Sequence, residues 1–70
     1  MDVPVKAIGV TAGNHVKFEN GDVVYVHRTT AREDRHGMVT WLVENALGTQ
    51  WTESHMAHRV VMLTSDNTNA

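Results

Sequence analysis

The sequence predicts a small all-β domain, and three observations lead to this prediction. Val, Ile and Thr make up 20 of the 70 residues, and such β-branched side chains suit a pleated strand better than a helix. No window of about 11 residues shows the i, i+3, i+4, i+7 apolar spacing of an amphipathic helix. The dipeptide Asn20-Gly21 stands between two apolar runs, which is a strong signal for a β-hairpin. We therefore expect strands joined by short turns and no helix longer than two turns.

Each predicted strand is an apolar or alternating run that ends at turn residues. The strands span residues 3–10, 15–18, 22–28, 37–44, 49–54 and 59–63. The first two runs are separated by residues 11–14 (TAGN), and Gly and Asn tolerate the positive φ of a turn. Residues 54–58 are too few for a full helix, so a short 3-10 turn is expected there, with Ser54 as its N-cap.

The second predicted hairpin carries both tryptophans. Trp41 shares its face with Val39 and Val43, so we assign it to the core. The strand around Trp51 is polar on both faces, which predicts that this side chain is exposed. The full predicted core consists of Val24, Val26, Val39, Trp41, Val43, Val61 and Leu63.

Length and composition exclude several classes of protein. Seventy residues allow one domain, which we place at residues 1–64, with residues 65–70 as a flexible C-terminal tail. The absence of Cys excludes a disulfide framework and Cys-containing zinc sites. The chain has no apolar run long enough to span a bilayer, and its N-terminus has an acid at Asp2 and no basic segment. We therefore expect a cytoplasmic protein without a membrane span or signal peptide.

Four short segments carry a resemblance to a known fold. They are residues 21–26 (GDVVYV), residues 36–39 (HGMV), residues 48–51 (GTQW) and the turn before Val60 and Val61. Over about two-thirds of the chain this order resembles a small SH3-like barrel of the Tudor or KOW kind. The resemblance implies a five- to six-stranded barrel with a short 3-10 turn before the last strand. It also implies an open face on which aromatic side chains bind a peptide or a modified side chain.

The favoured function is a non-enzymatic protein-interaction module. The chain lacks a nucleophile motif such as G-x-S-x-G, and no cofactor is expected. Burial of an exposed aromatic ringed by loop charges would provide the binding energy. The partner is another protein or a second copy of the chain, and by analogy of fold the role is accessory or regulatory, of bacterial or phage type. The predicted partner-binding residues are Tyr25, Arg28, Arg32, Arg35, Trp51, His55 and His58.

Two alternatives use other residues of the chain. The charged loop from Arg28 to Arg35 could hold nucleic acid phosphates, although the formal charge of −2 does not favour nucleic acid. His55 and His58 form an H-x-x-H pair, which would share a face on one helical turn and begin a metal site. The third ligand would then come from His36, or else from Glu53 or Asp66.

Overall fold

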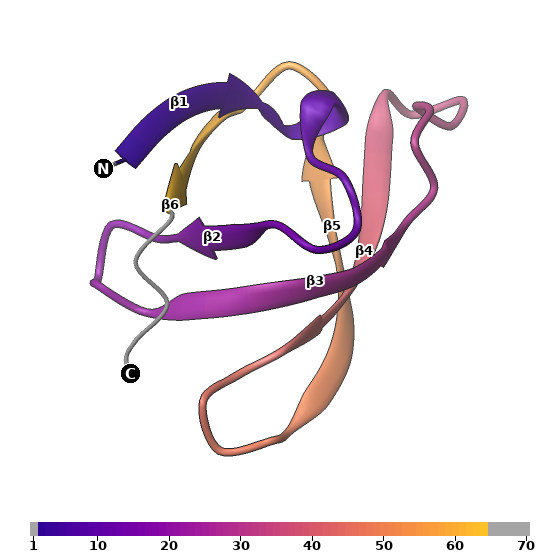
Figure 1. The fold of residues 1–70 in the computed structure, drawn as a ribbon. Helices are drawn as coiled ribbons and strands as arrows, with labels where there is room; N and C mark the ends of the chain where they lie inside the picture. Colours follow the sequence, from indigo (N-terminus) through magenta and orange to yellow (C-terminus); the bar gives the residue numbers. More distant parts are fainter. Residues whose placement is uncertain (1, 65–70) are drawn as a thin grey trace.

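The computed structural model describes residues 2–64, which form one six-stranded antiparallel sheet (Figure 1). The strands are β1 (Asp2–Lys6), β2 (His15–Lys17), β3 (Val23–Thr29), β4 (Met38–Glu44), β5 (Gln50–Met56) and β6 (Val60–Thr64), and a 3-10 turn, η1, spans Ala7–Gly9. The all-β prediction is confirmed, and the bounds of β2 to β6 agree with it to within two residues. The predicted tail, residues 65–70, lies outside the described residues. The described part of the chain contains no helix that is long and apolar enough to cross a membrane.

The sheet has two free edges. Its strand order is β1-β6-β2-β3-β4-β5, so β1 and β5 lie at opposite ends of the ladder. The sheet bends, and β2 and β3 run across the direction of β4 and β5 (Figure 1). Among the described residues β5 pairs only with β4. The sheet is therefore not closed, and the expected SH3-like barrel is not confirmed.

The prediction of a 3-10 turn before the last strand is wrong. The backbone of β5 stays extended through Met56, and a turn of two residues, Ala57 and His58, leads to β6. The alternation of side chains along the edge strand continues past Ser54, which is therefore a strand residue and not a helix cap. His55 and His58 consequently do not share the face of a helical turn.

The observed 3-10 turn lies instead within the run that the sequence assigned to the first strand. The backbone N–H of Ala7 donates to the carbonyl of Arg59 at 2.8 Å, and that of Ile8 donates to the carbonyl of Ala57 at 3.0 Å. These two tertiary hydrogen bonds turn the chain away from β1 and hold η1 against the β5–β6 turn. They connect segments about fifty residues apart, so local sequence does not reveal them.

Both predicted hairpins are confirmed. Val16 of β2 lies opposite Val24 of β3, and their turn contains Gly21 with φ of 93°. That left-handed backbone suits glycine, because an L side chain there would crowd the following carbonyl. In the second hairpin β4 and β5 pair over seven residues without interruption.

The core lies on the concave side of the bent sheet. Six of the seven predicted core residues are buried, and Leu63 is half-buried against them. Trp41 is the largest fully buried side chain of the described residues. The buried apolar residues that the sequence analysis did not assign to the core are Ala7, Val10, Val16 and Ala57. Ala7 begins η1 and Val10 follows it, so the 3-10 turn adds the first segment to the core.

Candidate functional site

An open groove of about 920 Å³ lies at one end of the concave side. Its walls come from the β2–β3 turn, residues 18–24, and from the β4–β5 turn, residues 45–47. The inward face of β5 and Arg59 complete the lining. The groove therefore combines two turns with the exposed edge strand of the sheet.

Strand pairing explains why β5 directs large side chains into the groove. Directly opposed residues of an antiparallel pair point to the same face. Trp51 lies opposite the buried Val43, and Glu53 lies opposite the buried Trp41. The alternation of β5 thus places an aromatic ring and a carboxylate side by side along the groove.

His55, the next inward residue of β5, is buried between two aromatic rings. Its ring centroid lies 4.4 Å from that of Trp41 and 5.9 Å from that of Phe18. Arg59 Nη1 lies 3.4 Å from His55 Nδ1. Because a guanidinium can only donate, Nδ1 is the acceptor in this contact, which places the ring hydrogen on Nε2.

Three buried polar atoms have no hydrogen-bond partner among the described residues, and two of them belong to residues that line the groove, Glu53 and His55. The three atoms are Trp41 Nε1, Glu53 Oε1 and His55 Nε2. His55 Nε2 lies 3.6 Å from Glu53 Oε1, which is longer than a hydrogen bond. Each such unpaired atom costs about 1–3 kcal/mol. Native proteins contain few of them, and a cluster marks a place that calls for an explanation.

The groove is acidic. Glu19, Asp22 and Glu53 line it, against a single arginine, Arg59. Within residues 2–64, no lysine or arginine forms an ion pair with any of these three carboxylates. Asp22 Oδ2 does accept a hydrogen bond of 3.1 Å from the side-chain amide of Asn20, which orders the β2–β3 turn.

The β4–β5 turn forms the rim of the groove. Asn45 Oδ1 accepts hydrogen bonds from the backbone N–H groups of Leu47 at 3.0 Å and Thr49 at 2.9 Å. This local network fixes the turn and leaves the side chain of Leu47 90% exposed. Trp51, which is 37% exposed, stands nearby on the same wall. An apolar rim therefore borders the acidic groove.

The opposite, convex face carries a separate polar cluster. Tyr25 lies opposite Glu44 in the register of β3 and β4, and its ring contacts His15 and His27. Glu44 Oε1 accepts hydrogen bonds from the amide of Gln50 at 2.9 Å and from His27 Nε2 at 2.8 Å. These two bonds stabilise the carboxylate and lower the pKa of Glu44.

The charged loop between β3 and β4 is ordered by Asp34. Its Oδ1 accepts the backbone N–H groups of Met38 at 3.1 Å and His36 at 2.7 Å, and these bonds lower the pKa of Asp34. Arg32 and Arg35 are exposed on the same loop. The loop is thus a local, self-capped structure at a distance from the groove.

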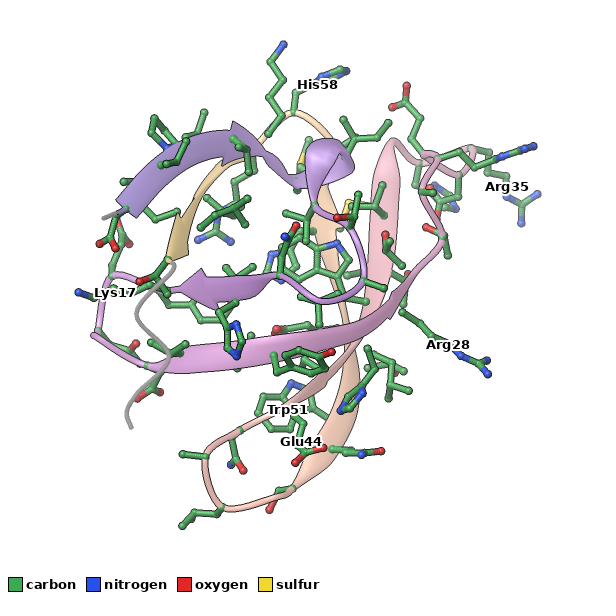
Figure 2. All side chains as sticks on the ribbon, in the orientation of Figure 1. Lys17, Arg28, Arg35, Glu44, Trp51 and His58 are labelled. Atoms are coloured by element: carbon green, nitrogen blue, oxygen red, sulfur yellow. The ribbon has the colours of Figure 1, made fainter. Side chains whose placement is uncertain are left out.

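The structure distributes the predicted partner-binding residues over several surfaces. Trp51 and His55 meet at the groove, whereas Tyr25 lies on the convex face. In Figure 2, Arg35 and His58 lie at the far end of the molecule from Trp51, and Arg28 points away from the sheet. His55 is buried and not part of an exposed turn, because β5 extends through it.

Of the residues that line the groove, only Trp51 and His55 were predicted to bind a partner; the contributors that sequence reasoning missed include Phe18, Arg59 and Leu47, and Glu53 was considered only as a metal ligand. The alternation of Trp51, Glu53 and His55 could have indicated a common face for the last part of β5. The polarity of Glu and His concealed it, since a buried face is normally recognised by apolar residues.

The structure does not bring the proposed histidine ligands together. His55 faces inward from β5, while His36 and His58 are exposed in two different turns. Within the part of the chain that the structure describes, no three His, Cys, Asp or Glu side chains are grouped to hold a metal ion. Asp66, the remaining candidate ligand, lies outside that part.

Comparisons of the chain with protein-family models, curated proteins and solved structures find no match.

Proposed function

We propose that this protein is a non-enzymatic interaction module that binds a segment of a partner protein in the concave groove. The observation that carries the proposal is the combination of an apolar rim, Trp51 and Leu47, with two groove-lining residues, Glu53 and His55, that each carry an unpaired polar atom. A bound segment would cover the rim and donate hydrogen bonds to the carboxylate of Glu53, whose side chain is 26% exposed.

The rim residues suit protein recognition. Trp is enriched among the residues that dominate binding energy at interfaces, since a large rigid ring buries much area at little entropic cost. Trp51 is partly exposed beside a fully exposed leucine, and covering both removes apolar surface from water. The groove is also elongated by the free edge of β5, along which an extended segment can lie.

The chemistry of the lining favours binding over covalent catalysis. The described groove residues include no Ser, Thr, Cys, Lys or Tyr. Ser54 cannot serve as a nucleophile in the groove, because its side chain lies on the face away from Trp51. There its hydroxyl forms a hydrogen bond with that of Thr40 at 2.8 Å. The His55–Glu53 pair therefore has no neighbouring nucleophile to activate.

An SH3-like architecture belongs to this proposal. Short antiparallel strands in one strongly bent sheet support it, and the free edges of β1 and β5 are a departure from a closed barrel. By analogy of fold alone, such a module acts as an accessory or regulatory subunit of bacterial or phage type.

Selection from a phage-displayed library of random peptides tests the proposal. Peptides enriched on the wild-type protein should lose about thirtyfold or more in affinity on Trp51→Ala, the usual effect of a hot-spot residue. Val60→Ala is the matched control, because this side chain is 60% exposed and lies outside the groove. Enriched peptides that bind Trp51→Ala as well as wild type would refute a binding role for the groove.

A further inference from the structure

From the charge and geometry of the groove we infer that it selects partner segments carrying an arginine side chain, with the guanidinium stacked on Trp51 and paired with Glu53. This inference rests on the proposed function and names the chemistry of its ligand.

Charge complementarity is the first argument. The groove holds three carboxylates and one arginine, and Glu19, Asp22 and Glu53 form no ion pair with a lysine or arginine within residues 2–64. Arg59 directs a guanidinium nitrogen to His55 instead. An anionic segment would be repelled by this excess of like charge, whereas a cation entering the groove relieves it.

The spacing along β5 is the second argument. Trp51 and Glu53 are two residues apart on the inward face, which separates their side chains by about 7 Å. A planar guanidinium on the face of Trp51 can therefore reach the neighbouring carboxylate. Stacking of Arg on Trp adds a cation–π contribution, and a carboxylate accepts two parallel N–H bonds from the same group.

The Glu53 carboxylate provides a third observation. Its Oε1 accepts no hydrogen bond from the described residues, although it lies 3.6 Å from His55 Nε2, and the side chain as a whole retains 26% exposure. Rotation of the carboxylate about its last bond, which is soft, can turn this oxygen towards the groove. A donor that fills the groove would then satisfy a carboxylate that the chain itself leaves without hydrogen-bond donors.

Arginine fits this site better than lysine. A lysine ammonium is a compact, strongly hydrated charge that offers neither a planar face to Trp51 nor a two-pronged donor to Glu53. A bare metal ion fits less well than either, because the described residues provide no group of three ligands.

The experiment uses the full chain and the peptides selected from the random library. Groove-dependent peptides should be enriched in arginine. Replacing that arginine by citrulline, its uncharged analogue, should weaken binding about tenfold or more in calorimetric titrations, the scale of a charge-assisted hydrogen bond. Replacement by lysine should also weaken binding, and equal binding of the lysine peptide would overturn the preference for arginine.

Protein variants locate the charge that the peptide recognises. Glu53→Gln keeps the shape of the side chain and should lose about tenfold or more in affinity. Glu33→Gln removes the same charge from the exposed loop and should bind as wild type. Glu19→Gln, at an exposed turn position, should also weaken binding and serves as the second groove variant if Glu53→Gln fails to fold.

The results separate the two proposals. Peptides that depend on Trp51 but bind equally with citrulline would overturn the inference and leave the interaction module intact. Equal losses on Glu33→Gln and Glu53→Gln would also overturn it, because the effect would then come from net charge. Peptides that do not depend on Trp51 would overturn both proposals.

Discussion

Replacement of the two tryptophans should have opposite consequences, and Trp41→Ala is the decisive variant. Trp41 is fully buried at the centre of the core, where truncation of a Trp to Ala costs about 3–5 kcal/mol. A chain of this length has a total stability of about 4–10 kcal/mol. The melting temperature of so small a domain falls about 4–8 °C for each kcal/mol, so Trp41→Ala should melt about 12–40 °C lower than wild type or fail to fold.

Thermal unfolding followed by far-ultraviolet circular dichroism measures this effect. Trp51→Ala provides the comparison, because this ring is partly exposed at the groove rim, and its loss should cost about 1–2 kcal/mol while the melt stays cooperative. A Trp41→Ala protein that melts cooperatively within a few degrees of wild type would refute the assignment of the core. Unfolding of Trp51→Ala would instead show that the groove wall is part of the core.

Three further outcomes concern the surface outside the groove. The lowered pKa of Glu44 means that its contribution to stability is present above about pH 4.5 and is lost as pH falls further; the difference in melting temperature between wild type and Glu44→Gln should therefore shrink on acidification, and a pH-independent difference would contradict the bond to His27. Asp34→Ala should accelerate amide hydrogen exchange within its own loop, where the carboxylate accepts two backbone N–H groups, and unchanged exchange would show that the loop does not need this cap. Charge reversal of Arg32 and Arg35 to Glu should speed association with an arginine-bearing groove peptide, because the protein becomes more negative, and leave its dissociation rate unchanged; salt-sensitive binding to a random DNA duplex that these reversals abolish would favour the nucleic-acid alternative.

The predictable part of the fold is the part encoded in neighbouring residues. The Asn20-Gly21 turn and the alternation around Val39, Trp41 and Val43 set two hairpins and the face that they bury. Turn chemistry and strand alternation are local properties, so a single sequence reveals them. For the same reason the exposure of Trp51 could be predicted from its polar neighbours.

The unpredicted part depends on contacts between distant segments. The backbone bonds of Ala7 and Ile8 to the β5–β6 turn end the first strand early, and nothing in the local run of Val and Ala residues indicates this. His55 was expected in an exposed turn because histidine is more often at the surface than in a core. Its burial requires the rings of Phe18 and Trp41 on either side, which only the tertiary fold brings together.

The polar residues Glu53 and His55 in the groove lower the stability of a small domain, and we explain their presence by binding. Hydrophobic residues in place of Glu53 and His55 would remove two of the three unpaired buried polar atoms, and apolar replacements of similar shape are often neutral or stabilising. A chain with about 4–10 kcal/mol of total stability nevertheless carries a carboxylate beside a buried imidazole. Such a local violation of packing rules is expected where function and not folding determines the residue. The same reasoning predicts that Glu53→Leu folds at least as stably as wild type yet no longer binds groove-dependent peptides. A Glu53→Leu protein that is less stable than wild type would show that the carboxylate supports the fold itself.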